Sequence, residues 1–85
     1  MSSSQSKRRN RLEIIFDILR VCWEPVLKTQ IMYRATLSFY QLNEYLDFVE
    51  KRRLIVKRGN HWRITKKGLR YIRTFKRIQS LLERT

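Results

Sequence analysis

The segment S-F-Y-Q-L-N-E-Y-L, residues 38–46, has the pattern of an amphipathic helix from its first turn. Ser38 and Gln41 are spaced as a capping box, in which each side chain accepts a hydrogen bond from the other residue's backbone N–H group. The face expected to be buried repeats at helical spacing and consists of Leu42, Tyr45, Leu46 and Val49. The expected outer face carries Tyr40, Gln41, Glu44, Asp47 and Lys51. A phase shifted by one residue would instead bury Tyr40 and expose Phe39.

Two further helices are predicted before this segment. Residues 28–35, K-T-Q-I-M-Y-R-A, place Ile31, Met32 and Ala35 on one side, and Thr36-Leu37 leaves room only for a tight connection. The first helix is expected over residues 11–23, with Asn10 as its N-cap and Pro25 after its end.

The first helix has more apolar surface than burial on one side requires. Its main stripe consists of Leu12, Ile15, Phe16, Leu19, Cys22 and Trp23, and a second stripe consists of Ile14, Ile18 and Val21. We therefore expect this helix to pack against two neighbours, one of which can be a second subunit.

A β-hairpin is predicted after the segment. Residues 54–58 and 61–64 have strand character, and Gly59-Asn60 between them is a two-residue turn signal. Strand alternation directs Trp62 and Ile64 inward and His61 and Arg63 outward.

A long final helix is expected over residues 66–84, capped by Thr65. Tyr71, Phe75, Ile78 and Leu82 are spaced as a coiled-coil seam for a second copy of the chain. The simpler interpretation is that this stripe packs as core against the first helix.

The chain has 85 residues, which is enough for one small domain. Its charged residues are distributed very unevenly along the sequence. Of the net charge of +13, all but one unit falls in residues 51–85, which hold thirteen basic residues and one acid, Glu83. Such a balance indicates a polyanionic partner, with nucleic acid preferred to an anionic membrane surface. No apolar run reaches the length of a membrane span. The single cysteine, Cys22, fits a reducing cytoplasm.

The order helix, helix, tight turn, helix and hairpin is that of a winged helix-turn-helix. In such a unit the third helix buries one face on the first two helices, and its other face can enter the major groove of DNA. The hairpin, or wing, would place basic side chains beside the flanking backbone. The predicted fold class is therefore mainly α with a β-hairpin (α+β), followed by a long C-terminal dimerisation helix.

The segment K-T-Q-I-M-Y-R-A-T-L-S-F-Y-Q-L-N-E-Y-L-D-F-V-E-K-R-R-L-I, residues 28–55, with W-R-I-T-K-K-G at residues 62–68, resembles archaeal winged-helix proteins. It is most similar to their small, basic, ten-kilodalton group, described as chromatin-associated or regulatory proteins. The resemblance covers residues 10–72 and implies DNA as the ligand and a homodimer joined by an antiparallel coiled coil of the C-terminal helices. Lys66 stands where the family commonly has an acid, and the final helix is short, so we expect Ile14, Ile18 and Val21 to assist dimerisation.

These observations predict three parts: a flexible basic arm (residues 1–9), a winged helix-turn-helix domain (10–65) and a dimerisation helix (66–85). The arm lacks the apolar segment that a secretory signal requires. The candidate DNA-binding residues are Lys28, Thr29, Arg34, Ser38, Tyr40, Gln41, Asn43, Glu44, Lys57, Arg58, His61 and Arg63. The candidate dimer residues are Ile14, Ile18, Tyr71, Phe75, Ile78 and Leu82.

The favoured function is a homodimeric transcription regulator that binds double-stranded DNA in the cytoplasm, at the nucleoid. An architectural, chromatin-type protein and a protein-interaction module remain alternatives, because Glu44, Asp47 and Glu50 would repel phosphates and because a fold does not establish a function. Glu13 and Asp17 lie on one helix face but share it with Arg20, so we expect no enzyme. The lone His61 gives no metal site, and we expect no cofactor and no small-molecule ligand.

Overall fold

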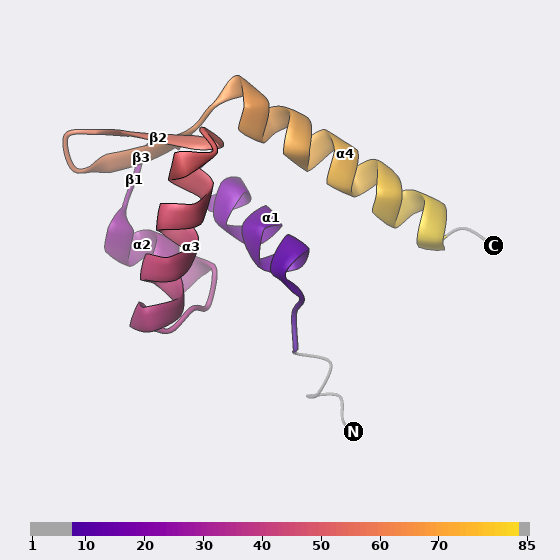
Figure 1. The fold of residues 1–85 in the computed structure, drawn as a ribbon, viewed down its shortest axis with the longest axis horizontal. Coiled ribbons are helices and arrows are strands. Elements are labelled where there is room, and N and C mark those ends of the chain that lie inside the picture. Colours follow the sequence, from indigo (N-terminus) through magenta and orange to yellow (C-terminus); the bar gives the residue numbers. More distant parts are fainter. Residues whose placement is uncertain (1–7, 84–85) are drawn as a thin grey trace.

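The computed structural model describes residues 8–83 and has the predicted α+β winged-helix architecture (Figure 1). Residues 1–7 of the expected arm and 84–85 of the expected final helix lie outside the described residues. The elements follow the chain as α1 (Arg11–Val21), β1 (Val26–Leu27), α2 (Lys28–Arg34), α3 (Phe39–Lys51), β2 (Ile55–Arg58), β3 (His61–Ile64) and α4 (Lys66–Glu83). None of the helices within residues 8–83 is long and apolar enough to cross a membrane.

Three helices begin at the caps that the sequence predicts. The Asn10 side chain accepts from the Glu13 N–H at 2.8 Å, and the Glu13 carboxylate accepts from the Asn10 N–H at 2.9 Å. Ser38 and Gln41 form the same reciprocal pair at the start of α3, with both bonds at 3.1 Å. Thr65 accepts from the Gly68 N–H at 3.1 Å before α4. These side chains satisfy backbone groups that a helix start would otherwise leave unpaired.

The core lies where α1 meets α2, α3 and α4. Five residues of α1 are buried: Ile14, Ile15, Phe16, Ile18 and Leu19. Ile18 is fully inaccessible and Ile14 is 6% exposed. The expectation that Ile14 and Ile18 face a second subunit is therefore corrected: other elements of the same chain cover them.

The main stripe of the first helix also needs correction at both ends. Leu12 and Trp23 were expected to be buried, but they are 56% and 57% exposed. The helix ends at Val21 with Cys22 as its C-cap, two residues earlier than predicted. Trp23 therefore lies outside the helix, and helical spacing does not determine which way its side chain faces.

The hairpin prediction is confirmed, but the sheet also has a third strand, β1, which the sequence pattern does not predict. The strand order is β1-β3-β2, with Val26 opposite Trp62 and Ile55 opposite Ile64. Gly59 supplies the positive φ of the turn, at +61°. Trp62 is buried while His61 and Arg63 are exposed, as strand alternation predicts. The sheet thus ties the wing to the segment between α1 and α2.

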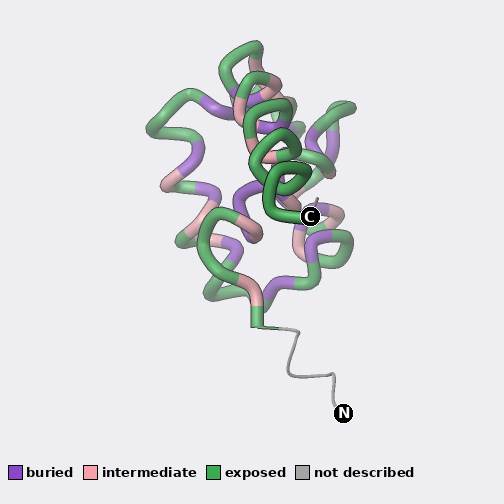
Figure 2. Tube along the Cα trace, turned by 90° about the vertical axis from the view of Figure 1, so that its right-hand side faces the viewer, coloured by how far each residue is buried: buried purple, intermediate pink, exposed green. Residues whose placement is uncertain are grey.

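The first half of α4 (residues 66–75) packs on α1 of the same chain, and the second half comprises residues 76–83. Phe75 stacks on Phe16 with ring centroids 4.5 Å apart, and the Tyr71 hydroxyl donates to the Leu12 carbonyl at 2.8 Å. The second half projects away from the domain with its surface exposed (Figures 1 and 2). Its exposed apolar side chains are Ile78, Leu81 and Leu82. The predicted seam is thus divided between intramolecular packing and a free surface.

Candidate nucleic-acid interface

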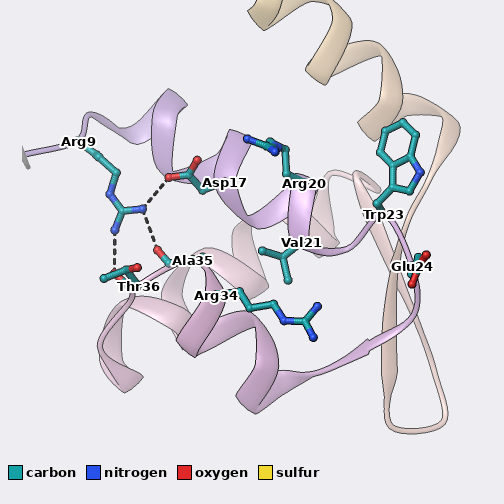
Figure 3. Close-up of a pocket in the computed structure, with 9 residues that line it drawn as sticks. All are labelled: Arg9, Asp17, Arg20, Val21, Trp23, Glu24, Arg34, Ala35 and Thr36. Atoms are coloured by element: carbon teal, nitrogen blue, oxygen red, sulfur yellow. Dashed lines mark hydrogen bonds and ion pairs between the residues drawn. The ribbon is translucent and has the colours of Figure 1, made fainter.

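The turn between α2 and α3 is held from outside by Arg9. Its guanidinium donates to the carbonyls of Ala35 and Thr36, each at 2.8 Å, and to the Asp17 carboxylate at 2.7 Å (Figure 3). Thr36 adopts a positive φ of 55°, and Leu37 is buried beneath the turn. Because these bonds orient the turn that precedes α3, Arg9 belongs to the folded domain. This corrects the expectation that the flexible arm extends through residue 9.

The outer face of α3 presents the expected residues, but several of their polar groups already have local partners. The Tyr40 hydroxyl donates to the Glu44 carboxylate at 3.3 Å. The Asn43 amide donates to the Phe39 carbonyl at 3.1 Å, and Gln41 is engaged in the capping box. Ser38, Tyr40, Gln41 and Glu44 are exposed, and Asn43 is half-buried.

The first turn of this helix carries two exposed aromatic residues, Phe39 and Tyr40. Phe39 is 66% exposed and Tyr40 is 71% exposed, so the expected outer position of Tyr40 is confirmed and the shifted phase, which would bury Tyr40, is wrong. Tyr33 on α2 is 76% exposed. The signal available in the sequence was that Phe39 and Tyr40 both precede the first buried position, Leu42.

The four basic wing residues are all exposed, but they lie on two faces of the hairpin. Arg58 is opposite His61, and Val56 is opposite Arg63, so Arg58, His61 and Arg63 share the outer face. Lys57 is opposite Trp62 and belongs to the other face, with its ammonium 5.5 Å from the Trp62 ring centroid. The structure therefore brings three of the four together.

A winged helix-turn-helix family model matches residues 8–83, nearly the whole chain. The chain belongs to the winged helix-turn-helix family. An uncharacterized protein of Methanocaldococcus jannaschii, MJ0287, is 35% identical over 72 residues, covering 76% of this chain and 74% of that protein. The crystal structure of Sso10a-2, a DNA-binding protein from Sulfolobus solfataricus, superposes with a TM-score of 0.76 at 28% identity, covering 88% of this chain and 83% of that one. Both relatives are archaeal, which confirms the resemblance to archaeal winged-helix proteins.

The α2 candidates of this winged helix-turn-helix occupy opposite ends of their helix. Lys28 and Thr29 form its first turn, and the Lys28 ammonium lies 5.4 Å from the Phe39 ring centroid at the start of α3. Arg34, in the last turn, instead lines a hollow between α1 and α2 with Arg20, Trp23 and Glu24 (Figure 3). Arg34 is thus separated from the other candidates.

The acidic pair considered for catalysis has structural partners in this winged helix-turn-helix. Glu13 caps α1 and Asp17 binds Arg9, so both carboxylates stabilise the domain. Burial raises the pKa of the Cys22 thiol to about 12, which keeps it protonated and unreactive at neutral pH. Within residues 8–83 there is no cluster of three or more histidine, cysteine or acidic side chains that could hold a metal ion.

Proposed function

We propose that this protein is a homodimeric winged-helix protein that binds double-stranded DNA and regulates transcription from the nucleoid. The observation that carries the proposal is the free outer surface of α3, accompanied by a wing whose outer face gathers Arg58, His61 and Arg63. A DNA major groove is wide enough for an α-helix, and wing cations suit the phosphates beside it. The DNA-binding protein Sso10a-2 has the same fold.

In the proposed complex the first turn of α3 enters the major groove, with Ser38, Tyr40 and Gln41 nearest the bases. Lys28 and Thr29 meet the adjacent backbone, and the wing meets the flanking phosphates or the minor groove. Asn43 and Glu44 follow in the second turn of the helix. Arg34 is the candidate expected to contribute least, because it faces the hollow between α1 and α2.

The proposed dimer uses the free half of α4. Ile78 is 50% exposed and Leu82 is 79% exposed, and Leu81 between them is 75% exposed. Apolar side chains exposed together on a projecting helix favour pairing with a second copy, because pairing removes them from water. Tyr71 and Phe75 would then border the interface from the half that packs on α1. A two-fold dimer would bind half-sites about 34 Å apart, or a multiple of that distance.

The proposed role is regulation of transcription at specific sites, rather than architectural coating of DNA. The face of α3 offers tyrosine, glutamine and asparagine, whose side chains can contact base edges. A footprint along a genomic fragment that holds a candidate operator tests it. Protection confined to spaced half-sites supports a regulator, and uniform protection would replace that reading with an architectural role.

Fluorescence anisotropy of a labelled duplex of about 30 base pairs, measured across a potassium chloride series, tests DNA binding itself. Each neutralised phosphate contributes about −0.9 to the slope of log K against log salt. The double variant Arg58→Ala, Arg63→Ala is expected to bind more weakly. Because the proposed dimer would lose four phosphate contacts, its slope should become shallower by about 3.6. The matched control is Lys76→Ala, Arg77→Ala, which removes two charges from the projecting half of α4.

Tight binding by the wild type with a steep slope supports the proposal. An unchanged affinity in the wing variant would remove the wing from the DNA interface. No binding to any duplex at low salt would overturn the proposal and favour a module that binds an acidic protein partner.

A further inference from the structure

The first turn of α3 presents two unburied aromatic rings at its leading edge. Phe39 and Tyr40 are 66% and 71% exposed, and Ser38 and Gln41 cap the helix without using either ring. The Tyr40 hydroxyl donates to the Glu44 carboxylate, and the Lys28 ammonium lies 5.4 Å from the Phe39 ring centroid. Adjacent exposed rings on a protein surface commonly mark an interaction site.

The polar neighbours of these rings are less available to bases than the sequence indicates. The Gln41 side-chain oxygen accepts from the Ser38 N–H, and the Asn43 amide donates to the Phe39 carbonyl. Glu44 accepts from the Tyr40 hydroxyl. Bidentate pairing of glutamine or asparagine with adenine would require breaking these bonds, including one that caps the helix. The rings can meet a ligand without breaking any bond within α3, except that of the Tyr40 hydroxyl.

Charge limits which part of α3 can approach DNA. Glu44, Asp47 and Glu50 follow on the later turns and repel phosphates, although Asp47 is paired with Lys51 at 3.2 Å. The first turn has no acidic residue, and it presents the positive end of the helix dipole with Lys28 beside it. The part of the helix best placed electrostatically to enter the groove is therefore the part that carries the two rings.

The major groove presents one apolar feature to a protein, the C5-methyl group of thymine. We propose that Phe39 and Tyr40 read thymine methyl groups, so that the protein favours duplexes with thymine in the groove that α3 enters. This inference rests on the proposed function and adds the base chemistry that the helix recognises.

The test replaces thymine by deoxyuridine, which removes the methyl group and keeps base pairing and charge. Two duplexes of about 30 base pairs and the same A·T-rich sequence, one with thymine and one with deoxyuridine, are titrated with wild type and with Phe39→Ala, Tyr40→Ala. The wild type is expected to bind the thymine duplex about fourfold more tightly for each methyl group covered, the factor for burying one methylene-sized group. The double variant is expected to bind both duplexes equally.

Two further variants separate the ring from other effects. Tyr40→Phe keeps the apolar ring and removes the hydroxyl, so it is expected to retain the preference for thymine. Trp23→Ala removes an exposed ring from the segment between α1 and β1, and it is expected to leave the preference unchanged. Comparing variants on both duplexes cancels any change that uracil makes to the DNA itself.

Equal wild-type affinity for the two duplexes, with tight binding to both, would overturn the methyl inference and leave the proposed function standing. An unchanged thymine preference in the double variant would also overturn it. Absence of binding to either duplex at low salt would overturn both. Tighter binding to single-stranded oligo(dT) than to either duplex would replace methyl recognition with stacking on unpaired bases.

Discussion

At the scale of single residues, the two glycines are required for different reasons. Gly59 has a φ of +61°, and a Cβ added there would meet nothing within 4 Å. At Gly68 an added Cβ would lie 2.4 Å from the Leu54 carbonyl oxygen and 2.6 Å from Cγ1 of Ile64. The first glycine permits a backbone conformation, and the second permits α4 to approach the wing closely.

Replacement of these glycines should distinguish the two roles. We expect Gly59→Ala to lower the free energy of unfolding by about 1 kcal/mol through φ strain, and Gly68→Ala to lower it by about 3 kcal/mol through overpacking. Asparagine tolerates positive φ, so Gly59→Asn should recover most of the loss, whereas Gly68→Asn should be worse than alanine. Urea denaturation measures all four variants, and recovery by asparagine at position 68 would contradict this account.

Arg9 is the residue whose role was least visible in the sequence. Its planar guanidinium reaches three acceptors at once, two of them carbonyls of the turn before α3. We expect Arg9→Ala to lower the free energy of unfolding by about 1–2 kcal/mol, because the half-exposed bonds lose a charged donor. Arg9→Lys should recover only part, since an ammonium cannot reproduce the fork of donors.

Arg8→Ala is the matched control in the same urea titration, because Arg8 is exposed and adjacent in the chain. It removes the same charge and is expected to change stability by less than about 0.5 kcal/mol. Equal effects at positions 8 and 9 would show that only net charge matters.

At the scale of elements, α4 combines two kinds of surface. Its first half is held by Phe75 on Phe16 and by the buried Ile72, and its second half exposes Ile78, Leu81 and Leu82. Substitutions in the two halves should therefore have different consequences.

We expect Ile78→Asp to give a folded monomer in sedimentation experiments, since it charges the proposed interface without touching the core. Phe75→Asp is expected to unfold the chain, because it places a carboxylate against the Phe16 ring. Gln79→Asp introduces the same charge one residue along and should leave the dimer intact. A wild-type monomer, or a dimer that survives Ile78→Asp, would exclude this half of α4 as the interface.

At the scale of the whole molecule, 85 residues carry a net charge of +13. Mutual repulsion lowers the stability of the folded state, and salt screens it over a Debye length of about 10 Å at 0.1 M. Salt also weakens binding to DNA, because the entropy gained by releasing condensed counterions falls as the bulk salt concentration rises. The same ions should therefore act in opposite directions on folding and on binding.

We expect the thermal unfolding midpoint of the free protein to rise between about 20 and 300 mM potassium chloride, while DNA affinity falls. A variant with Arg70→Glu and Arg73→Glu has less self-repulsion and should show a smaller rise. Calorimetry across the salt series measures both proteins. A midpoint that falls with salt would mean that attractive ion pairs outweigh repulsion.

The features that the sequence predicted correctly are those that depend on neighbours three or four residues away. The caps at Asn10, Ser38 and Thr65 and the turn at Gly59 are of this kind, and local chemistry suffices for them. The spacing of apolar residues likewise predicted the buried face of α3. The order of these elements then indicated the fold.

The tertiary structure decided which element covers each apolar face and which distant segments pair. Periodicity shows that a helix face is apolar, but the partner that covers it is a property of the packed molecule, so Ile18 became core and Phe75 packed on Phe16. The Arg9 guanidinium binds the carbonyls of Ala35 and Thr36, which are 26 and 27 residues away in the chain. Strand β1 pairs with β3 across a similar separation in sequence. Local bonds encode where an element begins, whereas the geometry of contact between elements selects which of its faces remains free to bind.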